Sequence, residues 1–403
     1  MKKLLITSEQ LFHPQIRQTM RYQVCALYED SRMIETELHR ADTETILNHI
    51  YVARVKNVVA SLHAAFVEIA QGNVCYLPLE DLKHPLFTKK ISKKTLVAGD
   101  ELVVQVAKEA VKTKDPVVTT NLSFAGEYLV LTSSNCRIGI SSKISGQERV
   151  RLHAFAQTLL REHACETEGF GLIFRTNAAN APEEDIREEF ARLWSEYQTL
   201  CAHAAARTVY SCLRREPPFY LKMLTDTDKT ELEEVVTDDR MVFEEIKQSV
   251  SGHFSVRFYE DRLLPLPRLY NVAGQIEAAL KPRVWLKSGA NLVIEPTEAL
   301  TVVDVNSGKN IAKKDKALNL YKINLEAAKE LAFQLRLRNL SGIIVTDFID
   351  MQEEEWKQKL MEQLRVYLRQ DPVPATLVDM TKLGLIEITR KKKKKPLAEQ
   401  LCV

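Results

Sequence analysis

The sequence predicts a multidomain protein of mixed α/β and β structure, and three features lead to this fold class. The chain has 403 residues, whereas single domains typically run about 100–200 residues. Four short strand-like runs separated by turn residues lie between residues 50 and 106, which suggests a small β-barrel. From residue 283 onward, apolar strand-like runs alternate with long helical segments, as is typical of an α/β sheet.

The composition narrows the class of protein. Hydrophobic residues make up 45% of the chain and charged residues 27%, which is typical of a soluble globular protein. No apolar run of about 18 residues occurs, so no membrane span is expected. Only residues 4–6 are apolar near the N-terminus, which excludes a signal peptide. We therefore expect a cytoplasmic protein, and the seven cysteines, which form no CxxC pair, are expected to be reduced thiols.

The positive charge is concentrated in two segments. The net charge is only +2, but residues 391–395 are an unbroken run of lysines and residues 83–94 contain five more. Such clusters attract a phosphate backbone through counterion release. On charge alone, an ordinary solvated loop or tail remains the better interpretation.

Periodicity places several elements. Pro182 and the acids that follow it begin a helix expected to run to about Arg214. A second helix is expected over residues 316–338, because its apolar residues recur near one face, and a third over residues 353–368. Strands are expected at residues 291–295, 300–304 and 342–347.

The clearest candidate site consists of Asp304, Asn306 and Asp347. Each aspartate ends an apolar run, and a helix separates the two runs, so the strands are expected to be neighbours in a covered sheet. Reacting groups collect at the carboxyl ends of such strands. Two carboxylates and an amide oxygen suit Mg²⁺, which can activate water for attack on phosphorus. The alternative is that the acids only cap loops; Asp350 is either a third acid or the beginning of the next helix.

Two strings of residues at this site resemble the catalytic signatures of the ribonuclease E/G family. They are LTVVDVNSG at residues 300–308 and GIIVTDFIDM at residues 342–351, and the similarity extends from near residue 1 to about residue 390. The resemblance implies an endoribonuclease that cuts AU-rich single-stranded RNA and leaves a 5′-phosphate and a 3′-hydroxyl. In this family's pattern Asp304 and Asp347 hold Mg²⁺, and Asn306 supports the site.

The resemblance also implies a division of the chain into six parts. An RNase H-like part is split between residues 1–36 and 217–282. Inserted between its halves are an OB-fold RNA-binding module at 37–122 and a 5′-end sensor at 123–216. A DNase I-like catalytic part at 283–390 and a basic C-terminal tail at 391–403 follow.

Further residues match RNA-binding positions of the family. Phe66 and Tyr76 are the matching aromatics of the OB module, where exposed rings stack on unpaired bases. Sequence alone leaves equally open that they fill the barrel core. Lys108, Lys114 and Lys382 match basic positions that face RNA, and the alternative for each is an ordinary solvated lysine.

A third match is the pocket for a 5′-monophosphate. Arg175 would clamp the phosphate with its planar guanidinium, and the Thr176 hydroxyl would add a hydrogen bond. Gly126 and Val130 match the segment that closes this pocket. Without the resemblance, a surface arginine would be the better interpretation of Arg175.

The chain departs from the family pattern in two places. The family often has a cysteine pair beyond the catalytic part, where two chains share one zinc ion; here Cys402 alone cannot supply four ligands, so zinc is not expected. Residues 371–376 also replace a more basic stretch, which is expected to lower the affinity for RNA.

Three hypotheses follow. The first is a magnesium-dependent endoribonuclease of single-stranded RNA, which could form a homodimer or a higher homo-oligomer. The second is an RNA-binding protein without catalysis, which would not need clustered acids. The third is a phosphoesterase of small substrates, for which an OB module would have little use.

Overall fold

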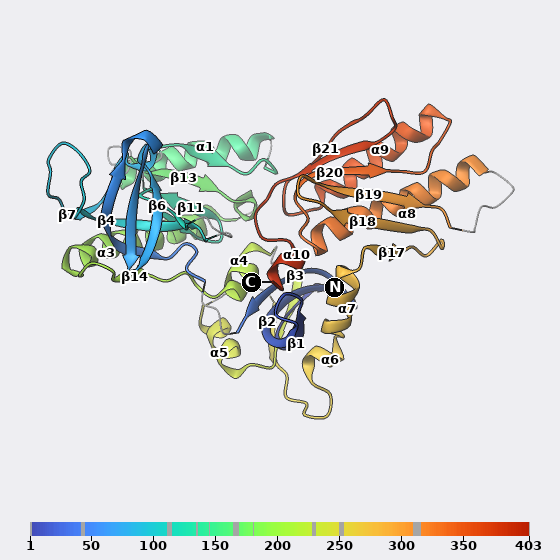
Figure 1. Cartoon of the computed structure of the whole chain (residues 1–403), viewed down its shortest axis with the longest axis horizontal. Coiled ribbons are helices and arrows are strands. Elements are labelled where there is room, and N and C mark those ends of the chain that lie inside the picture. The colour runs from blue at the N-terminus through green and yellow to red at the C-terminus, as the bar shows by residue number, and fades with distance from the viewer. Residues whose placement is uncertain are drawn as a thin grey trace. The chain divides into compact units, whose positions relative to one another are not determined.

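The chain folds into two compact units in a computed structural model, shown in Figure 1. The structure describes residues 2–41, 45–110, 115–133, 136–144, 146–163, 169–179, 181–227, 231–249, 254–308 and 316–402. The first unit comprises Met1–Thr43 and Lys229–Val403, and the second comprises Glu44–Asp228. The mixed α/β and β structure predicted from the sequence is confirmed. None of the helices within these ranges combines the length and the apolar character needed to cross a membrane.

The first unit contains a five-stranded sheet assembled from distant parts of the chain, in the order β16-β15-β1-β2-β3. Its strands are β1 (Lys2–His13), β2 (Gln18–Glu29), β3 (Arg32–Arg40), β15 (Leu232–Thr237) and β16 (Ser255–Phe258). The associated helices are α5 (Arg240–Ser249), α6 (Leu266–Leu269) and α7 (Val272–Leu280). Strand β15 pairs with β1 in parallel, so residues more than 200 positions apart share one sheet.

The C-terminal segment packs against this sheet. Leu397 and Leu401, in and just after α10 (Leu397–Gln400), are buried in the hydrophobic core of the sheet. The Leu38 backbone N–H donates to Gln400 Oε1 at 2.9 Å, and the Tyr22 hydroxyl donates to the Leu401 carbonyl at 2.8 Å. The segment expected to be a basic tail is therefore held against β2 and β3.

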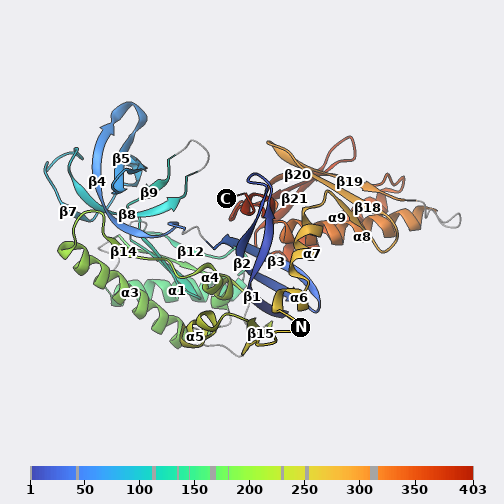
Figure 2. The ribbon, with the colours of Figure 1, turned by 60° about the horizontal axis from the view of Figure 1, so that its bottom comes forward.

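The first unit also contains a six-stranded sheet in the order β17-β18-β19-β20-β22-β21. Its strands are β17 (Arg283–Trp285), β18 (Asn291–Pro296), β19 (Leu300–Asn306), β20 (Gly342–Asp347), β21 (Ala375–Met380) and β22 (Ile386–Arg390). Helices α8 (Lys316–Leu337) and α9 (Glu354–Arg369) confirm the two predicted helices. Figure 2 shows both helices on one side of this sheet.

The two faces of the six-stranded sheet differ. Val303 and Ile344 are buried against the helices, whereas their chain neighbours Val302 and Ile343 remain 41% and 51% exposed. Alternate side chains of a strand point to opposite faces. We call the side away from α8 and α9 the open face.

The acid at position 371 has a structural role. Asp371 accepts two hydrogen bonds from the buried Arg390 guanidinium, which also donates to Asn339 Oδ1 and to the Leu340 carbonyl. Arg390, which precedes the run of lysines, is therefore part of the interior.

The second unit contains a closed five-stranded barrel, as the sequence predicts. The sheet order is β14-β4-β5-β6-β9-β8-β7, and an additional β4–β8 pairing closes the barrel. The strands are β4 (Ile50–Val59), β5 (Ala64–Ala70), β6 (Asn73–Pro78), β7 (Phe87–Lys89), β8 (Glu101–Lys108), β9 (Val117–Thr119) and β14 (Cys212–Arg214). Short 3-10 helices η1 (Ala60–Leu62) and η2 (Leu79–Asp81) follow β4 and β6. The barrel is OB-like.

A four-stranded sheet in the order β10-β11-β13-β12 completes the second unit. Its strands are β10 (Ser123–Ala125), β11 (Leu129–Thr132), β12 (Ile138–Ile140) and β13 (Gly171–Phe174). The helices are α1 (Gly146–Glu162), η3 (Thr176–Ala179), α3 (Glu183–Ala206) and α4 (Phe219–Asp226). Sequence analysis predicted that helix α3 would end at about Arg214. This prediction is wrong, because residues 212–214 lie outside the helix and pair with β4.

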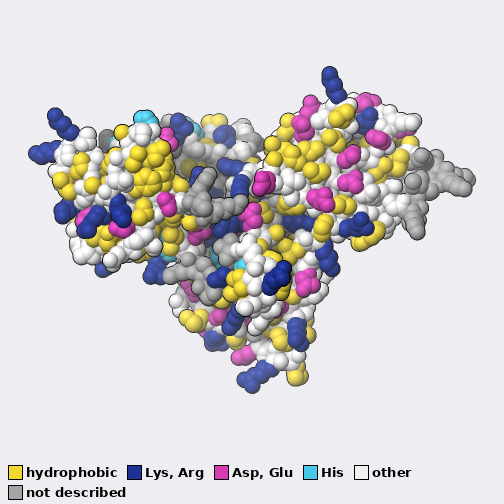
Figure 3. Space-filling view, viewed as in Figure 1, with side chains coloured by type: hydrophobic (Ala, Val, Ile, Leu, Met, Phe, Trp, Pro, Cys, Tyr) yellow, Lys and Arg dark blue, Asp and Glu magenta, His cyan; other side chains and the backbone are white. Residues whose placement is uncertain are grey.

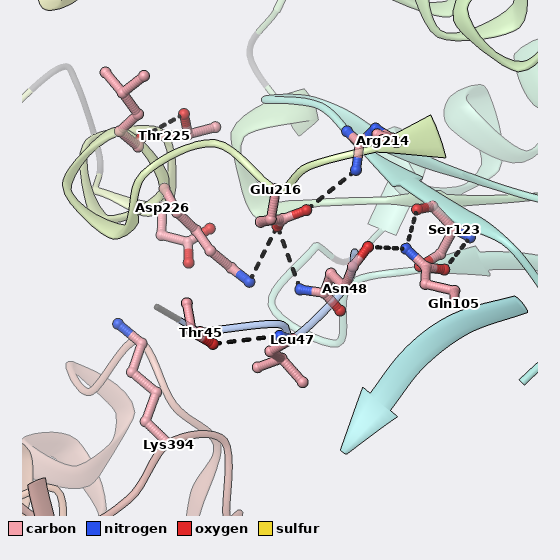
Figure 4. A network of polar contacts seen from close by, with 12 residues as sticks. Thr45, Leu47, Asn48, Gln105, Ser123, Arg214, Glu216, Thr225, Asp226 and Lys394 are labelled. Atoms are coloured by element: carbon pink, nitrogen blue, oxygen red, sulfur yellow. Dashed lines mark hydrogen bonds and ion pairs between the residues drawn. The ribbon is translucent and has the colours of Figure 1, made fainter. Parts of the chain in front are cut away.

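A glutamine joins the barrel to this sheet. Gln105 Nε2 donates to the carbonyls of Asn48 and Ser123 at 3.0 and 3.1 Å, and Gln105 Oε1 accepts from the Ser123 N–H at 2.8 Å (Figure 4). The finer division into six parts, with its RNase H-like and DNase I-like portions, stays a prediction.

Candidate active site

The two candidate aspartates lie side by side on the open face of the six-stranded sheet. Strands β19 and β20 are parallel neighbours, as predicted, and their register pairs Asp304 with Asp347. Adjacent strands are about 4.8 Å apart, and paired residues point to the same face. Both side chains are exposed. The strand register thus brings the two carboxylates together.

Asn306 belongs to the same group. It follows Asp304 by two residues and therefore lies on the same face of β19. Its Nδ2 donates to Asp304 Oδ2 at 2.7 Å. This hydrogen bond fixes the orientation of the carboxylate and directs the amide toward the pair of acids.

The electrostatics favour a bound cation at this group. Burial raises the pKa of Asp347, and the nearby carboxylates of Asp304 and Asp350 raise this pKa further. Repulsion between neighbouring carboxylates is relieved when a cation binds between them. Asp350 therefore lies close enough to add negative charge to this group.

The paired carboxylates of Asp304 and Asp347 could hold a hard cation. Within the described part of the chain, no group of three or more His, Cys, Asp or Glu side chains is placed to hold a metal ion. Two carboxylates and an amide match Mg²⁺, which keeps several waters, better than zinc, which takes four ligands in structural sites.

A buried asparagine positions the loop after β20. Asn324 on α8 is 0% exposed; its Nδ2 donates to the Ile349 carbonyl at 2.7 Å, and its Oδ1 accepts from the Ile349 N–H at 3.0 Å. The loop that carries Asp350 is therefore fixed to the helix. Sequence analysis missed this residue, although a polar side chain among the apolar positions of α8 was a usable signal.

The end of β19 is held by a close backbone approach. Gly308 has φ +66, and a Cβ at this position would lie 2.4 Å from the Gly289 carbonyl oxygen. Only glycine fits there without displacing the loop before β18. The same loop is held by Glu326, which accepts from the Lys287 N–H at 2.8 Å.

Lys382 lies at the same end of the sheet as the acids. It is exposed in the turn between β21 and β22, and the first residue of β22, Ile386, pairs with Thr346 next to Asp347. A basic side chain at this edge can contact a phosphate chain that reaches the acids.

The barrel carries an aromatic and basic row on its outer surface. The register aligns Phe66, Tyr76, Val117 and Lys108 across four strands. The two rings are 6.0 Å apart at an interplanar angle of 81°, both are half-buried, and neither belongs to the barrel core. Figure 3 shows hydrophobic side chains gathered over the barrel strands. Lys114 lies outside the described residues.

The residues expected to bind a 5′-monophosphate lie in and beside the four-stranded sheet. Arg175 Nη1 donates to the Gly126 carbonyl at 2.6 Å, and its Nη2 forms an ion pair with Asp226. The Thr176 and Ser141 hydroxyls are 2.9 Å apart. Val130 pairs with Ile173 across β11 and β13, which places it within the same sheet.

Glu189 holds the loop between β10 and β11 that carries Gly126, and sequence analysis missed it. Its carboxylate accepts the backbone N–H groups of Glu127, Tyr128 and Leu129 at 2.6, 2.9 and 2.9 Å. A Cβ on Gly126 would lie 2.3 Å from this carboxylate, so any larger residue would push Glu189 away from these hydrogen bonds. The signal in the sequence was an acid at helical spacing from the apolar residues Ile186 and Leu193 of α3.

Comparison with known proteins identifies a family for this chain. The profile of the Ribonuclease E/G family matches residues 123–393. Ribonuclease G of Haemophilus influenzae is 32% identical over 393 residues, which cover 94% of this chain and 79% of that protein. Ribonuclease G of Escherichia coli is 30% identical over 387 residues, covering 91% and 77%. Ribonuclease E of Nostoc sp. is 32% identical over 385 residues, covering 92% of this chain and 55% of that protein.

Similarity to these proteins over most of the chain defines an endoribonuclease, a hydrolase that acts on RNA. The chain belongs to the ribonuclease E/G family.

Proposed function

We propose that this endoribonuclease is magnesium-dependent and cuts single-stranded RNA in RNA processing and decay, leaving 5′-phosphate and 3′-hydroxyl ends. The observation that carries the proposal is the register pairing of Asp304 with Asp347, with Asn306 hydrogen-bonded to Asp304. Binding of RNA without cleavage would not require adjacent carboxylates, since negative charge repels phosphate.

Asp304 and Asp347 would hold the magnesium ion. When bound, Mg²⁺ supplies Lewis-acid polarisation of a phosphoryl oxygen. Asn306 keeps the Asp304 carboxylate in one orientation through its 2.7 Å hydrogen bond. Hydrolysis adds the water oxygen to phosphorus and breaks the bond from phosphorus to the 3′-oxygen, which takes up the proton.

Three groups of residues would bind the substrate. Phe66 and Tyr76 would stack on unpaired bases. Lys108 and Lys382 would bind phosphates, and the family pattern gives Lys114 the same role. Arg175, Thr176, Gly126 and Val130 would form the site of a 5′-monophosphate, so RNA bearing that end is the preferred substrate. The cytoplasmic location and the oligomeric state stay predictions.

Cleavage of a fluorescent single-stranded RNA with magnesium or with EDTA tests the proposal. We expect cleavage only with magnesium, and Asp304→Asn and Asp347→Asn should lower the rate at least about 100-fold without loss of RNA binding. Glu295→Gln, which removes an exposed carboxylate from β18, is the matched control. Full-rate cleavage by Asp304→Asn would show that the active site is elsewhere, and binding without cleavage would favour the non-catalytic alternative.

A further inference from the structure

Next to the paired acids, a second row of side chains crosses the open face. The register pairs Trp285 with Asn291, and Asn291 with Asn306. The neighbouring row runs from Arg283 through Val293 to Asp304. Both rows lie on the face away from α8 and α9, because Val284 and Leu292, which alternate with them, pack in the core on the other side.

Trp285 presents a large aromatic surface on this face. The side chain is 65% exposed, and the Arg283 guanidinium carbon lies 5.8 Å from the ring centroid. An exposed tryptophan ring offers a flat face on which an unpaired base can stack. Two strand spacings, about 10 Å in total, separate its backbone from that of Asn306.

Asn291 lies between Trp285 and Asn306 and has an unused acceptor. It is only 6% exposed, and its Oδ1 has no hydrogen-bond partner in the described part of the chain. A buried acceptor without a partner lowers stability by about 1–3 kcal/mol. A small shift of the side chain that brings Oδ1 to a donor of a bound ligand would remove this cost. The ligand must bring an N–H or O–H donor.

The charges around this row suit a phosphate chain. Arg283 and Lys287 are exposed on either side of Trp285. The row ends at Asn306, which is hydrogen-bonded to Asp304. A nucleobase is the group that combines a flat face for the ring with N–H donors at its edge. A second protein copy would not need the unused acceptor.

We infer that Trp285 and Asn291 form a nucleobase subsite beside the paired carboxylates. The ring stacks on one base of the RNA close to the cut, and Asn291 Oδ1 accepts a hydrogen bond from the edge of that base. This inference rests on the proposed function, since it assigns a subsite to the same active site.

An abasic scan of the substrate tests the subsite. Single-stranded RNAs carrying one abasic nucleotide at successive positions around the cut are cleaved by the full chain with magnesium. At one position we expect wild-type cleavage to slow about tenfold. Trp285→Ala should slow cleavage of intact RNA by a similar factor. The abasic nucleotide at that position should not lower the cleavage rate of this variant any further. Trp285→Tyr should retain most of the rate.

Two variants separate a binding role from a structural one. Val378→Ala removes a side chain that is 53% exposed at the other edge of the sheet and should change nothing. Asn291→Leu should unfold at the same or a higher temperature than wild type and yet cleave roughly three- to tenfold more slowly. A purely structural Asn291 would lose stability and activity together.

The outcomes distinguish this inference from the proposed function. If wild type cleaves RNA, but Trp285→Ala and every abasic position slow cleavage by additive amounts, the subsite is overturned and the proposed function stands. If wild type does not cleave, the proposed function fails. The subsite can then still be tested by tryptophan fluorescence, because RNA should quench the fluorescence of wild type and this quenching should be lost in Trp285→Phe. If Trp285→Ala changes only the oligomeric state in light scattering, the ring belongs to a protein interface.

Discussion

The guanidinium of Arg175 forms an ion pair with the carboxylate of Asp226, the last residue of α4. Its other terminal nitrogen donates to the Gly126 carbonyl. The arginine proposed to bind a 5′-phosphate therefore already holds an anion of its own chain. A phosphate, which carries a charge of about −1.5 to −2 at pH 7, must compete with this carboxylate.

Removing the competing charge should increase the preference for a 5′-monophosphate. We expect Asp226→Asn to raise the ratio of cleavage rates for 5′-monophosphate and 5′-hydroxyl RNA by up to about fivefold, because a partly exposed ion pair contributes about 0–1 kcal/mol. The measurement is initial rates on the two RNAs. Asp185→Asn, an exposed acid of α3, is the control, and Arg175→Lys should abolish the preference. An unchanged ratio in Asp226→Asn would mean that the ion pair does not compete with substrate.

The aromatic row of the barrel should bind RNA independently of catalysis. We expect Phe66→Ala to weaken the binding of single-stranded RNA about tenfold in an Asp304→Asn background, because stacking of one base contributes about 1–3 kcal/mol. Fluorescence anisotropy gives the Kd. Leu62→Ala removes a side chain that is 57% exposed outside the row and should leave the Kd unchanged. Equal losses in both variants would show that general surface hydrophobicity is responsible.

The buried amide of Asn324 should matter for both stability and cleavage. Asn324→Ala removes two hydrogen bonds to Ile349 and leaves that backbone without these partners, so we expect a loss of about 1–3 kcal/mol. Thermal unfolding measures this loss, and cleavage is measured well below the Tm. Lys322→Ala on the exposed side of α8 is the control. Cleavage at the wild-type rate by fully folded Asn324→Ala would show that the loop needs no such anchor.

Glu37 should make stability depend on pH in the acidic range. Burial alone would raise the pKa of this carboxyl, but hydrogen bonds and charge from His39 and Lys394 outweigh burial and hold the pKa at about 2. The Lys394 Nζ lies 2.5 Å and the His39 Nε2 3.1 Å from its carboxylate. Since the folded pKa lies below the unfolded value of about 4.3, the stabilisation is complete above that value and is lost as the pH falls toward 2.

The comparison of wild type with Glu37→Gln checks this dependence. Near neutral pH the variant should be less stable by on the order of 3 kcal/mol, and the difference should shrink as the pH falls from 5 toward 2. Urea unfolding at several pH values gives the free energies. Glu29→Gln, an exposed acid of β2, should show no such trend. A difference that stays constant down to pH 2 would contradict the assigned pKa.

Much of the site could be predicted because it follows from local patterns. Apolar runs ending in Asp304 and Asp347, with an amphipathic helix between them, specify parallel neighbours in one sheet. The prediction of a covered sheet holds for one face only, since Val302 and Ile343 are exposed on the other. The helix α8 was predicted to within one residue of its end at Leu337. These features depend on strand alternation and helical periodicity, which are properties of short segments.

Other features depend on contacts between distant segments. The helix α3 ends at Ala206 because residues 212–214 pair with β4, far away in the sequence. The sequence left open whether Phe66 and Tyr76 lie in the barrel core or on its surface. The strand register places both side chains outside the core. Asp226, Asn324 and Glu189 have a role only through partners that no local pattern reveals.

By itself, the sequence determined the elements, the pair of strands that carries the acids and the family signature, because hydrophobic periodicity and residue type act over a few residues. Only the tertiary structure decided which face each side chain occupies and which charges meet. Those choices depend on strand register and on the burial of groups from remote parts of the chain, where one hydrogen-bond partner or one like charge changes the free energy of a side chain.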